Sequence, residues 1–341
     1  MSKPRVWYIQ TASHTERVFD PADYQRMLDS FEVTVNETDR RYSSEDLAAE
    51  IAGFDGLVTG WSNAPPITSE VMENADKLKI IAHSAGSIKH VVSREIIDKY
   101  LIPRDVVLFS ANHAIAYNVA ESAVGMLLMA CHCWAQFAQS FRETGVWRPP
   151  AVRSNARFLQ GSTVGVISAS KVGREVIKLL SGWPLQLVLY DPYVTEEQAQ
   201  ELGVEKVELN ELFERSDHVT IHAPRLPATD NLIGAEQLKL LRDGATLVNT
   251  ARGNCLDHAA LLAAAAAGRI YVVLDVTEPE PLPADSPFRT LQNVAITPHV
   301  SGAGFYGYHK IGEITVDALA AAFAGKPVAG AVDYSKYDIL A

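Results

Sequence analysis

Three polar side chains that could act together on a small acid follow successive strand-like segments in the second half of the chain. Arg252 follows the apolar run ATLVN, Glu280 closes the segment VVLDVTEPE, and His299 follows NVAITP. A guanidinium binds a planar carboxylate through two parallel hydrogen bonds and stays charged at any working pH. An imidazole gives or takes a proton near neutrality, and a neighbouring carboxylate stabilises its charged form. The three residues predict a site that binds a carboxylate and moves a proton beside it.

Each residue of this set also has an ordinary interpretation. A lone arginine is usually a solvated surface charge, and a lone histidine after a proline is usually a loop residue. In an open parallel sheet, however, ligands bind at the carboxyl ends of strands, so polar residues that follow successive strands can meet in one crevice. We therefore interpret Arg252, Glu280 and His299 as one catalytic set.

The segments that must position this set alternate between strand-like and helical patterns, which is typical of βαβ units and a parallel sheet. A second series of the same kind begins after the Pro-Pro pair at 149 and 150. We expect an α/β protein with two doubly wound parallel-sheet domains. The expected strands are 6–9, 33–36, 56–59, 78–82, 163–167, 185–190 and 295–297, and the expected helices include 24–31, 46–51, 119–138 and 172–180.

Composition narrows the class of protein. The 341 residues, 48% of them hydrophobic, are enough for two domains with large cores. A net charge of −11, without a Lys/Arg cluster longer than a pair, argues against nucleic acid or an anionic membrane as partner. The start MSKPRVWYIQ shows no secretion signal, and the helix expected at 119–138 carries polar residues that make it fall short of a membrane span. We expect a soluble, cytoplasmic protein.

The chain has three cysteines, Cys131, Cys133 and Cys255, which cannot build a disulfide framework. The run Cys131-His132-Cys133 resembles a metal-binding pattern only superficially. Adjacent residues of a helix point in different directions, and no second Cys/His pair has the spacing of a zinc site. We expect no metal site.

Several motifs resemble the D-isomer-specific 2-hydroxyacid dehydrogenase family over most of the chain. The resemblance implies a flavodoxin-like substrate domain (1–112 and 305–341), a Rossmann-type dinucleotide-binding domain (113–304) that opens with the helix carrying Glu121 and Ser122, and a homodimer. It also implies reversible hydride transfer between nicotinamide C4 and C2 of a small-molecule 2-oxo or D-2-hydroxy acid. The matching segments are NTARG, DVTEPEPLP and TPH, in that order, together with YDPY at 190–193, SDHVTIHAPRLPAT at 216–229 and NLIGAEQL at 231–238.

The predicted cofactor loop departs from the dinucleotide fingerprint. That fingerprint has glycine at the positions of Ser168, Ser170 and Gly173, and only the third glycine is present. A serine hydroxyl could donate to a phosphate, and the start of the next helix still offers amide hydrogens. We expect Ser170, Lys171, Val172 and Gly173 to bind the cofactor, with the serines weakening binding without abolishing it.

Asp191 ends the next strand, 18 residues past Gly173. An acidic residue there accepts hydrogen bonds from the adenosine ribose and repels a 2′-phosphate. The alternative is a turn aspartate before Pro192. No arginine follows within ten residues to bind a phosphate, so NAD is favoured over NADP.

The resemblance implies further cofactor contacts. His222, Ala223 and Pro224 would pass beside the cofactor, and Thr250 and Ala251 would approach the nicotinamide ring. Asp275 would hydrogen-bond the carboxamide, and its alternative role is that of a cap or turn residue.

The loop HSAGSIKH, from His83 to His90, resembles the loop whose backbone amides bind the substrate carboxylate in the family. The family commonly has two glycines and an aspartate there, whereas this chain keeps Gly86 and has Ser87 and Lys89 at the other positions. We expect Ala85, Gly86 and Ser87 to bind substrate. Lys89 is interpreted as a solvated surface lysine, with a ligand for a second anionic group as the alternative.

By the same resemblance, Arg252 would bind the carboxylate and polarise the carbonyl, and His299 would protonate the carbonyl oxygen. Glu280, rather than Glu278, would hold His299 charged, because the family's acid lies five residues after the strand-end aspartate. A nicotinamide-sensing regulatory protein on the same fold is the alternative function. A Ser-His-Glu hydrolase is excluded because no G-x-S-x-G motif is present.

Overall fold

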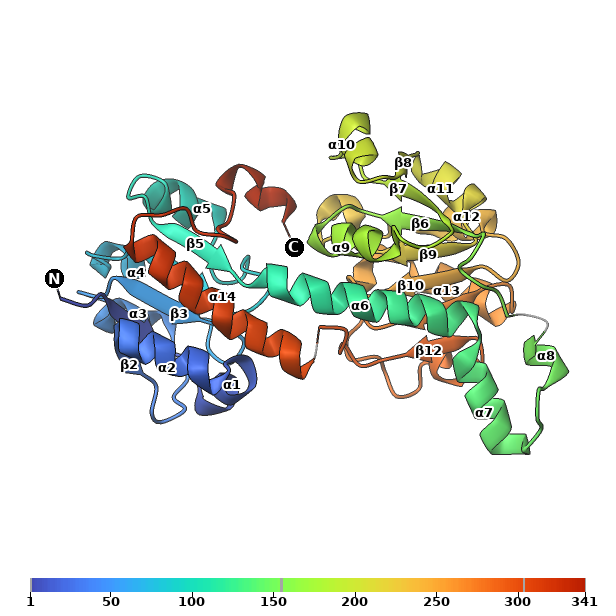
Figure 1. The fold of residues 1–341 in the computed structure, drawn as a ribbon, viewed down its shortest axis with the longest axis horizontal. Coiled ribbons are helices and arrows are strands. Elements are labelled where there is room, and N and C mark those ends of the chain that lie inside the picture. The colour runs from blue at the N-terminus through green and yellow to red at the C-terminus, as the bar shows by residue number, and fades with distance from the viewer. Residues whose placement is uncertain (1, 154–155, 303, 341) are drawn as a thin grey trace. The chain divides into compact units, whose positions relative to one another are not determined.

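The computed structural model describes residues 2–153, 156–302 and 304–340. The chain divides into two compact units (Figure 1): unit 1 is Met1–Ile115 with Ala303–Ala341, and unit 2 is Ala116–Gly302. The predicted boundaries, after residues 112 and 304, lie three and two residues from these bounds. Unit 1 is therefore built from two segments that are distant in sequence, and unit 2 from one.

Unit 1 contains a five-stranded, fully parallel sheet in the order β2-β1-β3-β4-β5. Thr59 pairs with His83, and His83 with Ser110, so the carboxyl ends of β3, β4 and β5 are level. Loops that leave these strands must therefore start at one edge of the sheet. The strands are β1 (Arg5–Tyr8), β2 (Glu32–Val35), β3 (Gly56–Thr59), β4 (Ile80–His83) and β5 (Val107–Ser110).

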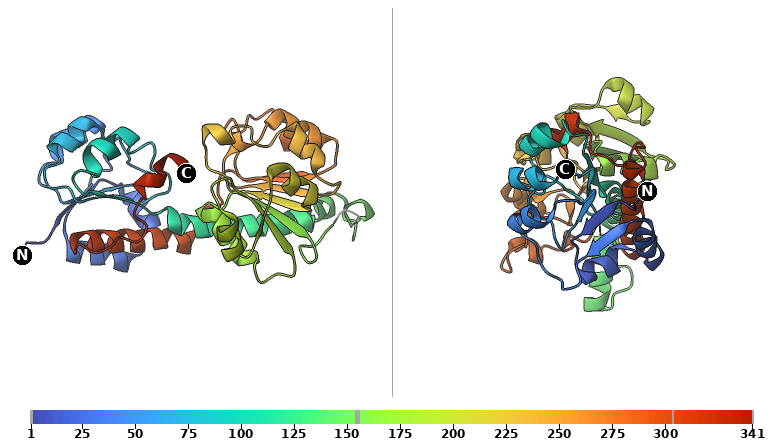
Figure 2. Two further views of the ribbon diagram at one scale, coloured as in Figure 1. Left: turned by 90° about the horizontal axis from the view of Figure 1, so that it is seen from above. Right: turned by 90° about the vertical axis from the view of Figure 1, so that its left-hand side faces the viewer.

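Helices cover both faces of this sheet because successive strand residues point to opposite sides. Trp7 and Leu57 pack with α3, α4 and α5 on one face, whereas Tyr8 and Val58 pack with α1, α2 and α14 on the other. Helix α14 lies beside α1 and α2 in both Figure 1 and Figure 2. The helices of unit 1 are α1 (Ala12–Val18), α2 (Pro21–Ser30), α3 (Ser44–Glu50), α4 (Ser69–Asn74), α5 (Arg94–Ile96) with the π turn Ile97–Leu101, α14 (Phe305–Phe323) and the 3-10 segment Tyr334–Ile339.

Unit 2 contains a seven-stranded parallel sheet in the order β12-β11-β10-β9-β6-β7-β8. Strand β6 lies between β7 and β9, so the strand order reverses there, which is the point where doubly wound sheets bind nucleotides. The strands are β6 (Thr163–Ile167), β7 (Gln186–Tyr190), β8 (Glu205–Lys206), β9 (His218–Ile221), β10 (Thr246–Asn249), β11 (Tyr271–Leu274) and β12 (Val294–Ile296). The prediction of two doubly wound parallel sheets is confirmed.

Two helical layers bury the faces of this second sheet. Helices α6 and α9 pack on one face, and α11, α12 and α13 pack on the other. The alanine run forms most of α13, and Gly268 follows it with a φ of +71°, as expected for a glycine that ends a helix. The helices are α6 (Asn112–Cys131, which begins in unit 1), α7 (Trp134–Thr144), α8 (Pro150–Arg153), α9 (Lys171–Leu180), α10 (Glu196–Glu201), α11 (Leu209–Arg215), α12 (Ala235–Leu240) and α13 (His258–Ala266), with 3-10 turns at Pro227–Thr229, Gly253–Cys255 and Pro287–Thr290.

The single helix predicted at 119–138 is wrong. Helix α6 starts seven residues earlier and stops at Cys131, because Cys133 is buried in a left-handed conformation (φ 54°) that an α-helix cannot contain. Helix α6 has 20 residues, and its mean hydropathy reaches 1.5 over an 18-residue window, so it meets the length and composition of a membrane span. Buried core helices meet the same criterion, and 44% of this window is buried.

The cysteines are buried and unpaired. Within the described ranges, no group of three or more His, Cys, Asp or Glu side chains is placed to hold a metal ion.

Candidate active site

The predicted catalytic pair is in contact at the carboxyl edge of the unit 2 sheet. His299 Nδ1 lies 2.5 Å from Glu280 Oε1, and the two side chains are 52% and 43% exposed. Glu278 does not share this contact: its carboxylate lies 3.6 Å from Arg225, and its backbone N–H donates to His258 Nε2. The geometry thus separates the two glutamates in the sense expected from the sequence.

A buried carboxylate fixes the turn that carries His299. Asp275, 2% exposed, accepts hydrogen bonds from Thr297 Oγ1 (2.5 Å) and from the backbone N–H groups of Val300 and Ser301 (both 2.9 Å). Its own carbonyl accepts from the His299 N–H at 2.8 Å. His299 has a φ of 53°, a costly conformation for a residue other than glycine. Asp275 therefore stabilises a strained turn, which agrees with the alternative role of a turn residue given above.

Arg252 is held just beyond strand β10 by a fully buried asparagine. Asn249 donates from Nδ2 to the Arg252 carbonyl (2.8 Å) and accepts from the Ala251 N–H (2.9 Å). Gly253 presses against the next loop, since a Cβ there would lie 2.2 Å from the Thr277 carbonyl group. Burial lowers the pKa of Arg252, while the charge of Glu280 acts in the opposite direction. The backbone at Arg252 is thereby fixed beside the segment that leads to Glu280, and the partly buried guanidinium donates to the Ala251 carbonyl at 2.7 Å.

The predicted cofactor loop keeps the shape of a dinucleotide turn despite its serines. Ser168 has a φ of 75°, where the fingerprint has its first glycine. Ser170 caps α9 by accepting from the Gly173 N–H at 3.3 Å. A Cβ on Gly173 would lie 2.0 Å from the Ser168 carbonyl oxygen, so this position requires glycine. Lys171 is exposed and Val172 is half-buried at the start of α9.

Asp191 is bonded to the same turn. Its Oδ2 accepts from the Ala169 N–H (2.8 Å) and from Ser168 Oγ (3.3 Å), and its Oδ1 accepts from the Tyr193 N–H (2.8 Å). Asp191 is buried, which brings the predicted ribose ligand next to the predicted pyrophosphate loop. The bond from the Tyr193 N–H also agrees with the alternative role of Asp191 as a turn residue.

Three of the buried polar atoms without a hydrogen-bond partner in the described residues follow the carboxyl ends of β9, β10 and β12. They are His222 Nδ1, Thr250 Oγ1 and Ser301 Oγ, on side chains that are 5% exposed or less. Burial lowers the pKa of His222 to about 3, so this imidazole is neutral. Unbonded buried polar groups are costly, and a ligand with amide and hydroxyl groups would satisfy them. Together with the glycine at 173, these residues fit a dinucleotide. Ala223 and Pro224 follow His222 in the chain, and Ala251 follows Thr250.

The predicted substrate loop belongs to unit 1. Ser110 Oγ donates to the carbonyls of Ala85 (3.3 Å) and Gly86 (2.6 Å), which fixes the loop at the carboxyl ends of β4 and β5. Ser87 is half-buried beside it. Lys89 is partly exposed, and its ammonium donates to the Asp338 carbonyl at 3.1 Å in an exposed hydrogen bond, so its interpretation as a surface lysine stays a prediction. The structure therefore places the predicted site residues in two sets, one in each unit.

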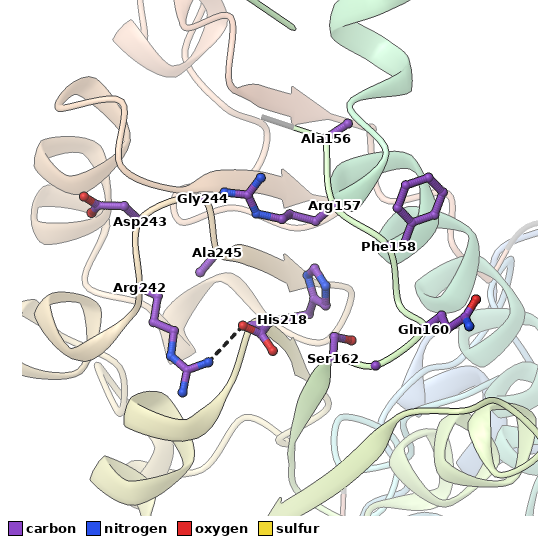
Figure 3. A pocket seen from close by; sticks show the side chains of 12 residues that line it. Ala156, Arg157, Phe158, Gln160, Ser162, His218, Arg242, Asp243, Gly244 and Ala245 are labelled. Carbon is purple, nitrogen blue, oxygen red and sulfur yellow. Dashed lines mark hydrogen bonds and ion pairs between the residues drawn. The ribbon is translucent and has the colours of Figure 1, made fainter. Parts of the chain in front are cut away.

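A cavity of about 380 Å³ lies away from these residues, at the amino ends of β6, β9 and β10 (Figure 3). Arg242, at its wall, is neutralised by Asp217 at 3.1 Å. Because ligands of doubly wound sheets bind at the opposite ends of the strands, we do not assign this cavity to the predicted chemistry. Its lining includes Phe158, Gln160, Ser162, His218 and Ala245.

Sequence reasoning missed the residues that hold the catalytic set in place. Asn249 and Thr297 lie within the motifs NTARG and TPH. A polar residue at the end of a strand inside such a motif could have indicated a residue that positions the catalytic set. Arg225, which lies 3.6 Å from Glu278, is also within a matching segment (216–229), whereas His258, which accepts from the Glu278 N–H, had no such signal.

Comparison with known proteins gives one consistent result. The family model described as D-isomer specific 2-hydroxyacid dehydrogenase, NAD binding domain, matches residues 124–301. A hydroxypyruvate reductase of Thermotoga maritima is 30% identical over 315 residues, which cover 90% of this chain and 98% of the relative. A D-3-phosphoglycerate dehydrogenase of Methanocaldococcus jannaschii is 32% identical over 286 residues, 83% of this chain and 52% of the relative. The chain thus spans about half the length of the phosphoglycerate dehydrogenases that it matches.

Solved structures agree. The TT0316 protein from Thermus thermophilus has a TM-score of 0.75 at 27% identity, covering 96% of this chain and all of that chain. The apo D-mandelate dehydrogenase of Rhodotorula graminis has a TM-score of 0.81 at 22% identity, covering 97% of this chain and 98% of that chain; at this identity the likeness concerns the fold.

Proposed function

The chain belongs to the D-isomer-specific 2-hydroxyacid dehydrogenase family, and on that premise we propose that it interconverts a 2-oxo acid and a D-2-hydroxy acid with NAD(H). The observation that carries this proposal is the His299–Glu280 pair, 2.5 Å apart, at the same sheet edge as Arg252. None of the relatives described above is a regulatory protein by name, so the nicotinamide-sensing alternative has no support from them.

Proton transfer and substrate binding fall to the residues of the catalytic set. Arg252 binds the substrate carboxylate and polarises the carbonyl oxygen. Glu280 engages His299 Nδ1, which leaves Nε2 to protonate that oxygen during reduction and to accept the proton in the reverse direction. The carboxylate of Glu280 stabilises the charged imidazole. When bound, NADH supplies the hydride.

The cofactor contacts are proposed from the loop geometry and from the unbonded atoms. The amides of Ser170, Lys171, Val172 and Gly173 bind the pyrophosphate at the start of α9. Asp191 binds the adenosine ribose and selects NAD over NADP. The remaining contacts, around the nicotinamide half, come from His222, Ala223, Pro224, Thr250, Ala251 and Asp275.

Unit 1 contributes the loop Ala85–Ser87, whose amides bind the substrate carboxylate. We also propose a homodimer, because large apolar side chains are exposed on α7 and after it: the rings of Phe141 and Trp147 lie 5.8 Å apart, and Trp147 is 77% exposed. Neighbouring exposed apolar side chains are typical of a protein interface. The others in this set are Trp134, Val146 and Phe158.

The test is reduction of a panel of 2-oxo acids, including glyoxylate, hydroxypyruvate, pyruvate and phenylpyruvate, with NADH oxidation as the readout and product configuration determined on a chiral column. We expect at least one acid to be reduced to the D-hydroxy acid. A protein that binds NADH in a titration but reduces none of the panel would instead support the nicotinamide-sensing function.

A further inference from the structure

A segment of unit 1 late in the sequence, residues 331–340, lies beside the edge strand β5 (Figure 1), and we call it the tail. The Val332 N–H donates to the Leu108 carbonyl at 2.8 Å. The Tyr334 hydroxyl donates to the Val106 carbonyl (2.6 Å) and accepts from the Leu108 N–H (3.0 Å). The tail is therefore anchored to β5 by both its backbone and a side chain.

The tail also contacts the chain just after the predicted substrate loop, Ala85–Ser87. Lys89 Nζ donates to the Asp338 carbonyl at 3.1 Å, and Arg94 Nη1 donates to the Tyr334 carbonyl at 2.8 Å. The Lys89 bond is exposed, so water competes for it and its net contribution is small. These two bonds join the tail to the segment into which the loop continues.

Tyr337 makes the buried part of this contact. Its ring is 5% exposed and packs with Ile88, Val91 and Val92 in the core of unit 1. Its hydroxyl donates to the Val92 carbonyl in a buried hydrogen bond. The N–H groups of Val91 and Val92 both donate to the Ile88 carbonyl, at 2.9 and 3.0 Å. Tyr337 therefore holds a turn that begins at residue 88, directly after the loop.

The loop is thus held at both of its ends. Ser110 Oγ of β5 donates to the carbonyls of Ala85 and Gly86, and the tail, bonded to the same strand, holds residues 88–94. These bonds use carbonyls of the loop, and within the described residues the N–H groups of Ala85, Gly86 and Ser87 have no hydrogen-bond acceptor. The loop backbone is fixed while its donors remain available to an anionic group.

We propose that Tyr337 is a positioning residue for the substrate: through the tail, and assisted by Lys89, it holds the amides of Ala85–Ser87 in the geometry that binds the substrate carboxylate. This inference rests on the proposed function. It adds a residue that acts on substrate affinity through the loop. The carboxylate does not react, so its contacts are the same in the ground state and the transition state, and a misplaced loop raises KM more than it lowers kcat.

The experiment measures kcat and KM for the best acid of the panel, with NADH, in the parent and Tyr337→Phe proteins. Tyr337→Phe keeps the ring in the core and removes the hydroxyl that donates to the Val92 carbonyl. We expect KM to rise by about fivefold or more and kcat to change by less than about twofold, because a buried carbonyl loses its donor and the turn after the loop shifts. NADH affinity should stay parental.

Tyr100→Phe is the matched control. Tyr100 lies in the same core and is also 5% exposed, but its hydroxyl donates to Glu73 Oε1 on α4, at 2.7 Å. This variant loses one tyrosine hydroxyl from the same core, so thermal unfolding should report a similar loss of stability. Its KM should stay parental.

Amide hydrogen exchange gives a readout that does not depend on activity. Exchange of the peptide that covers residues 84–90 should be faster in Tyr337→Phe than in the parent, and unchanged in Tyr100→Phe.

Lys89 provides a second variant. Lys89→Met should raise KM by about twofold, and this effect should disappear in the Tyr337→Phe background, where the tail is already released. Full additivity of the two substitutions would show that Lys89 contacts the substrate itself, and would overturn its assisting role. If Tyr337→Phe does not fold, exchange at residues 84–90 in Lys89→Met decides: a parental rate overturns the inference.

Two results overturn the inference while the proposed function stands: a parental KM in folded Tyr337→Phe, or an equal rise of KM in Tyr100→Phe. If the parent reduces no acid of the panel, the proposed function fails, and the role of Tyr337 toward a substrate fails with it. Reduction of an acid by the parent distinguishes the two failures.

Discussion

Two turns of unit 2, at residues 168–173 and 297–301, have similar hydrogen-bonding patterns but different proposed roles. Each places a residue other than glycine in the left-handed region, Ser168 and His299. In each, a buried strand-end aspartate accepts one hydroxyl and at least one backbone N–H of the turn, Asp191 in the first and Asp275 in the second. The Ser168 hydroxyl donates to this aspartate, whereas the His299 imidazole contacts Glu280 instead.

The difference indicates which of the two residues with a positive φ, Ser168 or His299, could be replaced by glycine without loss of the proposed chemistry. A glycine at 168 would adopt the observed φ without a steric cost. At 299 the strained conformation presents the side chain proposed to transfer the proton, so relieving it would also remove the chemistry. The following expected outcomes test this contrast.

The largest expected effect is the loss of the proton donor. His299→Ala should lower turnover by about 100-fold or more, the usual scale for a positioned general acid, with NADH affinity retained. Steady-state kinetics on the best acid of the panel measure it. His299→Asn is the control, because asparagine tolerates a positive φ and should be equally inactive. Near-parental turnover in either variant would disprove the role of His299.

Asp275→Asn should lower turnover by about tenfold and the free energy of unfolding by about 1–3 kcal/mol, because its amide nitrogen cannot accept from the donors that Asp275 now bonds. Thr297→Val removes only the hydroxyl bond and should shift turnover in the same direction by a smaller factor, with NADH affinity unchanged. Denaturant unfolding and NADH titration are the measurements. An unchanged Thr297→Val enzyme together with an NADH-binding defect in Asp275→Asn would show that Asp275 acts on the cofactor alone.

Asp191 should make NADH the preferred cofactor over NADPH by a factor on the order of ten or more, because a carboxylate repels a 2′-phosphate. Titration with both cofactors tests the preference. Asp191→Asn should narrow it and also loosen the turn that Asp191 holds. Equal affinities in the parent would remove Asp191 from its assigned role.

Glu280→Gln keeps the shape of the pair and removes the charge that favours the protonated imidazole. The amide of Gln would not stabilise a positive charge on the imidazole, so turnover should fall by about tenfold or more while NADH affinity is retained. Steady-state kinetics and NADH titration measure the two effects. Parental turnover in Glu280→Gln would mean that Glu280 does not act on His299.

The smallest expected effect is at the turn of residues 168–173. Ser168→Gly should raise the free energy of unfolding by less than about 1 kcal/mol, since relief of the left-handed serine is partly offset by the entropy of glycine. NADH binding should be preserved or tightened, and Ser170→Gly should behave likewise. A large loss of NADH affinity on Ser170→Gly would show that its hydroxyl is a required phosphate ligand.

Short apolar runs in the sequence predicted most of the strands and the order of residues along them, because buried parallel strands are short apolar runs. The expected ranges did not include β5 (Val107–Ser110), β8 (Glu205–Lys206) or β9 (His218–Ile221). The sequence pattern predicted that Arg252, Glu280 and His299 follow neighbouring strands. It could not predict the break at Cys133, since nothing in the local run WAQFAQ differs from a continuing helix. The short helix α1 (Ala12–Val18) was missed because only two of its residues, Ala12 and Val18, are apolar.

The bonds of Asp275 also lay beyond the sequence. They depend on the register of β11 against β12, which brings residue 275 beside residues 297–301. From the sequence alone, an aspartate at the end of a strand could cap a helix, stabilise a turn or bind a ligand. Its surroundings in the folded protein decide among these roles.

The division of unit 1 between two distant segments affects the order in which the molecule can assemble during synthesis. Unit 2 is continuous and has all of its strands once residue 302 has left the ribosome. The face of the unit 1 sheet that includes Tyr8 and Val58 lacks its α14 cover until about residue 323, and Gly312 must then approach the Val18 carbonyl closely, where a Cβ would lie 2.7 Å away. Unit 1 thus begins to emerge before unit 2 and is completed after it, so its apolar face is exposed in the nascent chain while unit 2 is synthesised.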